Sequence, residues 1–359
     1  MAKKVDGVFE GGGVKGIGLV GAVSVIEKEG YQFENLAGTS AGAIVAGLLA
    51  IGYNADEIKT EMKKLNYNDF KDEGLLDKLG IIGKGLSIGF EYGIYEGEFF
   101  ENWFEKLAQR KGLTTFGQIK TKYKEDKYKY KFQAIATDIS DRRLLVLPGD
   151  LKFFGLNPDE FSISRAVRMS MSIPIFFEPV KLRDTSGRVH YIVDGGALSN
   201  YPIWLLDDGT SSPPWPTFGF KLVEPDKREL KRGERNPINN PISFFKAIIG
   251  TMMDAHDNYH ISNSSGDYER TMGISTVINM NGTDIEIKTT DFDITQEESD
   301  ALYQNGVDVG RKFIAAWDFE AWKKKYRSGT APKVTALKAA APKAAAAKTA
   351  KMGVRKGKN

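Results

Sequence analysis

The sequence predicts an α/β fold with a central, mainly parallel sheet. Two short apolar runs at residues 5–9 and 33–37 are typical of buried strands, and each is followed by a glycine-rich turn. Residues 17–28 then show helical spacing of apolar side chains before Gly30, and residues 43–51 form a small-residue helix that is apolar all round. A repeated strand–turn–helix order indicates parallel strands with helices packed on them.

The rest of the chain continues this alternation. We expect strands at residues 130–137, 143–147 and 188–193, a strand that ends within 291–295, and helices at 98–109 and 244–260. Thr295 and Glu298 have the spacing of a capping box, which predicts a helix running to about Trp317. Glycine-rich residues 74–98 predict a loop or lid, and residues 207–240, rich in Pro, Gly and charge, predict a surface excursion.

Length and composition allow one large domain or two ordinary ones. The 359 residues are 41% hydrophobic, enough for a substantial core. The chain has no cysteine, which excludes disulfides, thiol nucleophiles and thiolate metal sites. We see no apolar signal-peptide core near the N-terminus and no membrane-spanning run, so we expect a cytoplasmic protein, peripheral to the membrane at most.

The charge is distributed unevenly. The net charge is +3, but residues 331–359 hold eight Lys or Arg and no acid, so residues 1–330 carry a net −5. We therefore expect a single domain over 1–328, with its core motifs at 5–205 and a closing strand and helix near 291–317. Residues 329–359, rich in Ala, Lys and Pro, predict a disordered basic tail. The tail is either a solubilising extension or an arm for anionic lipid or nucleic acid.

The first candidate for chemistry is Ser40, in the sequence Gly38-Thr39-Ser40-Ala41-Gly42. This G-x-S-x-G pattern lies between an expected strand and an expected helix, the setting of a nucleophile elbow. Small residues are needed there because the turn is tight and holds the serine in a strained conformation. The alternative is an ordinary glycine-rich turn before a helix.

The second candidate is the loop Gly11-Gly12-Gly13-Val14-Lys15-Gly16. Successive glycines can point several backbone N–H groups into one concavity, which facing Ser40 would be an oxyanion hole. The loop also fits G-x-G-x-x-G, so a dinucleotide-binding domain is an alternative. That domain would want an acidic residue at the end of the second strand, whereas Glu34 opens it, and it would not explain the turn at Ser40.

The third candidate is Asp194, which ends an expected strand and is followed by Gly195 and Gly196. Its carboxylate can reach the same sheet edge as Ser40, although a plain Asp-Gly turn is the common alternative. The three histidines do not complete a triad convincingly. His256 and His260 follow Asp194 but lie one turn apart in an expected helix, and His190 lies in the strand that leads to Asp194.

Together these motifs resemble the patatin-like phospholipase family. The glycine loop matches its G-G-G-x-[KR]-G, Ser40 its G-x-S-x-G, and Asp194 to Gly196 its D-G-[GA], in the same order. Segments such as MSMSIPIFFEPV and DGGALSNYP extend the similarity, which covers about residues 5–317. One departure is Met169-Ser170, where the family often has Ala-Ser, and we interpret it as a packing change.

The resemblance implies a three-layer α/β/α fold and a lipid acyl hydrolase. It implies a Ser40–Asp194 dyad without histidine, in which Ser40 is the nucleophile and Asp194 the base. It also implies an oxyanion hole formed by Gly11, Gly12, Gly13 and the Ala41 N–H, with Lys15 available for an anionic head group. No metal and no cofactor is expected, and phospholipid or another acyl lipid is the expected partner. A catalytically idle module that binds lipid or protein is the alternative.

Overall fold

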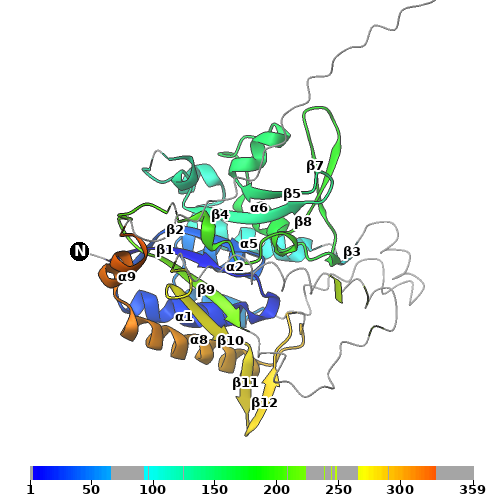
Figure 1. Cartoon of the computed structure of the whole chain (residues 1–359). Helices are drawn as coiled ribbons and strands as arrows, with labels where there is room; N and C mark the ends of the chain where they lie inside the picture. The colour runs from blue at the N-terminus through cyan, green and yellow to red at the C-terminus, as the bar shows by residue number, and fades with distance from the viewer. Residues whose placement is uncertain are drawn as a thin grey trace, which may run out of the picture.

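The computed structural model describes residues 3–65, 93–95, 97–223 and 266–328, apart from Lys124, Asp208 and Thr290, together with isolated positions between 238 and 248. An eight-stranded sheet forms its centre, with the order β10-β9-β1-β2-β4-β8-β7 and β5 paired to β4 (Figure 1). The strands are β1 (Lys3–Phe9), β2 (Tyr31–Thr39), β4 (Phe132–Asp138), β5 (Arg143–Leu147), β7 (Val180–Arg183), β8 (Val189–Asp194), β9 (Thr217–Val223) and β10 (Thr271–Ser275).

Strand direction divides the sheet into two parts. The five strands from β10 to β4 are all parallel to their neighbours, whereas β5 and β8 pair with β4 in the antiparallel sense, as does β7 with β8. The predicted α/β fold with a mainly parallel sheet is therefore confirmed. The carboxyl ends of β1 and β2 lie next to each other at the centre of one sheet edge, where ligands of parallel sheets usually bind.

Two long helices pack on one face of the parallel half. They are α1 (Gly16–Lys28) and α8 (Gln296–Ala316), which lie side by side in Figure 1. Glycines allow their backbones to approach closely, because a Cβ at Gly21 would lie 2.0 Å from the Tyr303 carbonyl oxygen. The predicted capping box of Thr295 and Glu298 is present at the start of α8, and the helix ends next to Trp317 as expected.

The remaining helices contribute to the same large apolar core. They are α2 (Ala41–Ala50), α3 (Ala55–Lys63), α5 (Glu98–Lys111) and α6 (Ile163–Ser170), and a short α9 (Phe319–Tyr326) follows α8. On the opposite face, a smaller cluster joins Val8, Ala37 and Ile135 to the 3-10 turn Ile203–Leu205. The two outer layers are thus unequal among the described residues, with long helices on one face and short turns on the other.

Two short strand pairings lie outside the main sheet among the described residues. Strands β11 (Val277–Met280) and β12 (Thr283–Glu286) form a hairpin, and β3 (Gly93–Tyr95) pairs with β6 (Ile175–Phe177). The expected strand ending within 291–295 is wrong, because the last strand stops at Glu286 and residues 291–295 form turns that lead to the α8 cap. Turn-forming Asp and Thr side chains explain the difference.

The prediction that 207–240 is a surface excursion is wrong for β9. This strand lies between β1 and β10 in the sheet, and Phe218 and Phe220 are fully buried. The composition of its flanks concealed it, since Pro213, Pro214 and Pro216 precede the strand and charged residues follow it. The turn-forming residues on both sides dominate the composition of residues 207–240, so the seven residues of the buried strand are not evident from composition.

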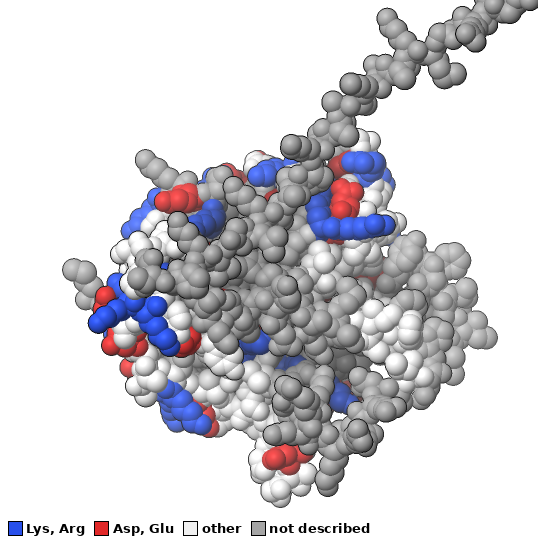
Figure 2. All heavy atoms as spheres, in the orientation of Figure 1, with Lys and Arg blue, Asp and Glu red and all other residues white. Residues whose placement is uncertain are grey.

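Several predictions fall outside the described residues. These are the helix at 244–260 apart from isolated positions, most of the loop or lid at 74–98, and the tail at 329–359. Within the described ranges, no helix has both the length and the apolar character needed to cross a membrane. On the face shown in Figure 2, basic and acidic side chains of the described residues lie beside each other.

Candidate active site

Ser40 occupies a sharp turn between β2 and α2. Its backbone has φ 53° and ψ −124°, a conformation that side-chain-bearing residues rarely adopt. Neighbouring glycines make the turn possible, because a Cβ at Gly38 would lie 2.3 Å from the Gly42 carbonyl oxygen, and one at Gly42 would lie 2.3 Å from the Phe9 carbonyl oxygen. The turn that the sequence predicted is therefore present, with the strain that such an elbow requires.

A buried hydroxyl holds this turn from the neighbouring helix. The Ser40 N–H donates to Ser170 Oγ at 3.0 Å, and Ser170 Oγ donates to the Ile135 carbonyl oxygen at 2.6 Å. Ser170 is fully buried at the end of α6. The sequence pattern marked Met169-Ser170 only as a packing change, because nothing in one sequence showed that α6 would meet the turn at this point.

Asp194 reaches the same edge on an antiparallel strand. Strand β8 begins beyond the carboxyl end of β4 and runs inward, so that Asp194 pairs with Ala136 while Thr39 pairs with Ile135. The residue after Thr39 is Ser40, which therefore lies at the level of Asp194. The carboxyl is almost fully buried, at 1% exposure. The structure thus brings together the two side chains that the sequence separated by more than 150 positions.

The Asp194 carboxyl has an unusual environment. Its Oδ1 accepts the Gly196 N–H at 2.7 Å, and its buried Oδ2 has no hydrogen-bond partner among the described residues. Burial raises the pKa of Asp194 to about 7, although the nearby Ser40 hydroxyl and the Gly196 N–H act in the opposite direction. A carboxyl with a pKa near neutrality, an unsatisfied oxygen and a serine hydroxyl beside it can exchange a proton at ordinary pH.

The glycine loop begins directly after β1. The Gly11 N–H donates to the Asn200 carbonyl oxygen at 3.0 Å, and Asn200 Nδ2 donates back to the Gly11 carbonyl oxygen at 3.2 Å. A Cβ at Gly11 would lie 2.2 Å from Asn200 Oδ1, so only glycine fits there. Asn200 therefore ties the loop to the segment that follows Asp194, and its role was missed by the sequence motifs.

Three other N–H groups of the site stay available. The N–H groups of Gly12, Gly13 and Ala41 have no hydrogen-bond partner in the described part of the chain. Gly13 adopts φ +56°, which favours glycine and turns the loop. Ala41 opens α2, where the helix dipole favours negative charge. Lys15, in the 3-10 turn Gly13–Lys15, is buried beside the loop, at 4% exposure.

An apolar cleft ends at Ser40. Its walls come from α2, α3, α5 and the segment around β6, and they include Ile44, Met62, Phe100, Trp103, Met171 and Phe177. Polar atoms contribute almost nothing to the lining apart from Ser40 and the loop backbone. An apolar lining of this kind favours hydrocarbon over water beside the serine.

His190 lies apart from this site. Its Nδ1 is 2.9 Å from Asp138 Oδ2, and both side chains are buried. With Asp141 they form the group among the described residues whose ligand atoms are close enough to hold a metal ion, but the Arg143 guanidinium already lies 3.5 Å from Asp138. His256 and His260 fall outside the described residues. The expectation that no metal takes part stays a prediction.

Comparisons with known proteins identify a family for this chain. The profile of the family described as patatin-like phospholipase matches residues 7–207. The chain is 38% identical over 315 residues to YqhO of Bacillus subtilis, an uncharacterised protein, covering 88% of this chain and 99% of that one. It is 26% identical to a probable lipid hydrolase of Invertebrate iridescent virus 6, covering 55% and 61% of the two chains.

A solved structure shows the same fold. VipD from Legionella pneumophila matches with a TM-score of 0.50 at 18% identity, covering 88% of this chain and 67% of that one. The three motifs of the sequence, the turn at Ser40 and the extent of the family match lead to one conclusion. This chain belongs to the patatin-like phospholipase family.

Proposed function

We propose that this protein is a serine acyl hydrolase that cleaves ester bonds of phospholipids or other acyl lipids. The observation that carries the proposal is the meeting of three features: the strained Ser40, the buried Asp194 with a pKa near neutrality, and an apolar cleft that ends at the serine. A hydroxyl becomes a nucleophile when an adjacent base removes its proton, and the apolar lining of the cleft suits the acyl part of a lipid.

In the first half of the reaction, ionised Asp194 accepts the hydroxyl proton as Ser40 Oγ attacks the ester carbonyl. The N–H groups of Gly12, Gly13 and Ala41 stabilise the oxyanion of the tetrahedral intermediate. Gly11 has a different role, because its N–H is engaged by Asn200 and its lack of a side chain lets the loop approach Ser40. Collapse of the intermediate leaves acylated Ser40, and the proton on Asp194 passes to the departing alcohol.

In the second half, water replaces the alcohol. Asp194 accepts a proton from the water as its oxygen attacks the acyl carbon, and the same N–H groups stabilise the second oxyanion. Ser40 leaves with that proton, and a free fatty acid is released. Lys15 is the proposed contact for an anionic head group, and we propose peripheral contact with a membrane because the substrate resides there. Neither step requires a metal or a cofactor.

The alternative is an idle member of the family that binds lipid or protein without turnover. No residue of the proposed machinery is altered from the family motifs, which favours an active enzyme. A cytoplasmic location and a tail that binds anionic lipid or nucleic acid remain part of the proposal, as does a role in lipid catabolism or as an effector that degrades membranes.

The test compares wild type with Ser40→Ala. A fluorophosphonate probe should label the wild type alone, and release of fatty acid from a panel of defined lipids should fall by at least about 10³-fold in the variant. Ser186→Ala, a change at an exposed turn serine, is the matched control and should behave as wild type. Equal labelling of wild type and Ser40→Ala would rule out the nucleophile, and inactivity of the wild type on every lipid would favour the idle module.

A further inference from the structure

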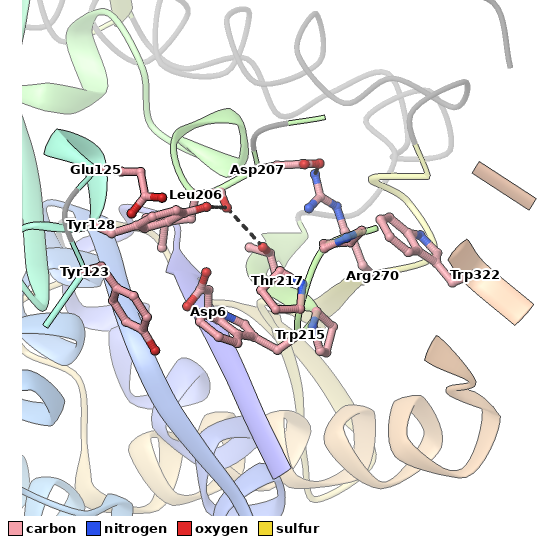
Figure 3. Close-up of a pocket in the computed structure, with 13 residues that line it drawn as sticks. Asp6, Tyr123, Glu125, Tyr128, Leu206, Asp207, Trp215, Thr217, Arg270 and Trp322 are labelled. Atoms are coloured by element: carbon pink, nitrogen blue, oxygen red, sulfur yellow. Dashed lines mark hydrogen bonds and ion pairs between the residues drawn. The ribbon is translucent and has the colours of Figure 1, made fainter. Parts of the chain in front are cut away.

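A second cavity lies at the opposite edge of the sheet. It encloses about 350 Å³ near the amino ends of β9 and β10, with Asp6 of β1 at its floor. Figure 3 shows the Asp6 carboxyl pointing into the space between Tyr128 and Trp215. Along β1, Asp6 is separated from Glu10 at the catalytic edge by about 13 Å, using ~3.3 Å per residue. The cavity is therefore distinct from the acyl cleft, and the proposed reaction makes no use of it.

Aromatic rings and acceptor oxygens dominate the walls. Tyr123, Tyr128, Trp215 and Trp322 contribute rings. The Leu206 carbonyl oxygen, which accepts from Tyr128 and Thr217 at 3.4 Å each, points at the same region (Figure 3). The lining also includes three prolines, which have no N–H groups: Pro213, Pro214 and Pro216. Such a lining offers few donors to an anion and several π faces and oxygens to a cation.

The charges of the cavity point the same way. Arg270, the one cation among the described lining residues, is already bound by Asp207 at 2.7 Å and by Asp267. Arg327 also pairs with Asp207, so this corner is balanced. The carboxyls of Asp6 and the exposed Glu125 remain on the other side. Among the residues that line the cavity, three acids (Asp6, Glu125 and Asp207) therefore accompany one base, Arg270.

We propose that this cavity binds a small organic ammonium ion, such as choline or the choline head group of a lipid. Aromatic faces beside a carboxylate are the chemistry that recognises quaternary ammonium groups. Cations of the protein already show this preference, since Lys4 Nζ lies 5.0 Å from the Trp215 ring centre and Lys127 Nζ lies 4.6 Å from that of Tyr128. Lys122 and Arg327 lie over Tyr123 and Trp322 in the same way, so a bound ammonium ion would share the rings with these side chains. A metal ion fits less well, because the carboxylates of the cavity do not converge as those of a metal site do.

Binding should depend on pH through Asp6. Burial raises the pKa of this carboxyl to about 7, against the effect of Asn35 and Trp215, which hydrogen-bond to it, and with a smaller contribution from Glu34. The other charged or titratable groups on this side include the tyrosines and acids of the lining, the paired Arg270, and three lysines that lie over the rings: Tyr123, Tyr128, Glu125, Asp207, Lys4, Lys122 and Lys127. An ammonium ion is attracted by the ionised carboxylate, so its affinity should increase between pH 6 and pH 8.

Calorimetric titration of the full chain with choline tests the proposal, using the Ser40→Ala protein to prevent hydrolysis. We expect a dissociation constant on the order of 1 mM, and about tenfold weaker binding of the neutral isostere in which a carbon replaces the nitrogen. Asp6→Asn and Trp215→Leu should each weaken choline binding about tenfold, whereas Trp204→Leu, an exposed tryptophan outside the cavity, should not.

A further variant and a competition experiment complete the test of choline binding. Glu125→Gln, an exposed change at the rim, should weaken binding about twofold to threefold, and it serves if Asp6→Asn does not fold. Competition by phosphatidylcholine vesicles would identify the lipid head group as the source of the ammonium, and its absence would identify a free ion. Equal binding of choline and its neutral isostere, or no heat up to about 50 mM choline, would overturn the proposal.

Discussion

The two edges of the sheet each hold a buried aspartate, and they differ in what surrounds it. Asp194 at the carboxyl edge and Asp6 at the amino edge are 1% and 2% exposed, and burial raises the pKa of each to about 7. Asp6 Oδ1 accepts the Asn35 N–H at 3.0 Å and Asn35 Nδ2 at 2.8 Å, and Trp215 also hydrogen-bonds to the carboxyl. Asp194 accepts the Gly196 N–H and lies beside the Ser40 hydroxyl.

This comparison shows that a raised pKa does not by itself identify a catalytic group. The same desolvation acts on both carboxyls, so the distinction comes from their neighbours. Near Asp194 lie the hydroxyl of Ser40, whose backbone is strained, N–H groups without a partner among the described residues, and an apolar cleft. These features suit acyl transfer. Near Asp6 there are rings, carbonyl oxygens and prolines, which suit recognition of a cation. Four experiments test this distinction between the two aspartates.

The largest effect is expected for Asp194→Asn. The amide keeps the shape of the carboxyl but cannot accept the serine proton, so the rate of ester hydrolysis should fall by about 10²-fold or more. Asp150→Asn is the matched control, because Asp150 is a partly buried carboxyl whose pKa burial also raises, and it accepts the Val146 N–H away from Ser40. Similar losses in the two variants would show that any buried carboxyl matters, against the assignment of a base.

The pH profile of the wild type should sharpen the comparison. Only ionised Asp194 can accept the proton of Ser40, so kcat/KM on a neutral soluble ester should rise about tenfold per pH unit below pH 7 and level off above it. The measurement is a rate profile from pH 5 to pH 9 with one substrate at low concentration. A profile that is flat through pH 7 would contradict the role of this carboxyl.

Ser170→Ala should produce a smaller effect on the same edge. Loss of the acceptor for the Ser40 N–H loosens the turn, so kcat should fall about tenfold while KM stays close to that of wild type. Ser164→Ala removes another buried hydroxyl of α6, one that contacts Glu105, and should leave kcat unchanged. If both variants lose activity in proportion to their loss of melting temperature, Ser170 has a structural role only.

The smallest effect concerns stability and the other aspartate. The pKa of Asp6 in the folded protein, about 7, lies above the 3.8 of a free aspartate, so its contribution to stability is fully present below the unfolded pKa. That contribution falls as the pH rises and is gone once the pH has passed the folded pKa. Denaturant titrations should therefore show a decrease of about 1 kcal/mol per pH unit between pH 4 and pH 7 from this group, and no further decrease from it above pH 7. In Asp6→Asn the decrease should be reduced, and an unchanged slope would contradict the burial argument.

Local patterns predicted much of the fold and the core of the site. The turn at Ser40, the glycine loop and the capping box at Thr295 are set by residues next to one another in sequence, so they could be recognised without a structure. The strand β9 was concealed by its proline-rich and charged flanks, and the strand expected to end at 291–295 was misplaced because its residues form turns. Both strand predictions were wrong for the same reason: composition reports which residue types surround a segment, whereas a strand is defined by the neighbouring strand with which it pairs.

By itself the sequence determined which residues carry the reactive groups, because Ser40, Asp194 and the glycines each lie in a short motif with its own backbone requirement. The tertiary structure decided how they meet. An antiparallel β8 brings Asp194 level with Ser40, Ser170 reaches the turn from α6, and Asn200 engages the Gly11 N–H that the motif had assigned to the oxyanion hole. These contacts join residues 130 to 189 positions apart, and such pairings depend on strand order and helix packing, which no local pattern encodes.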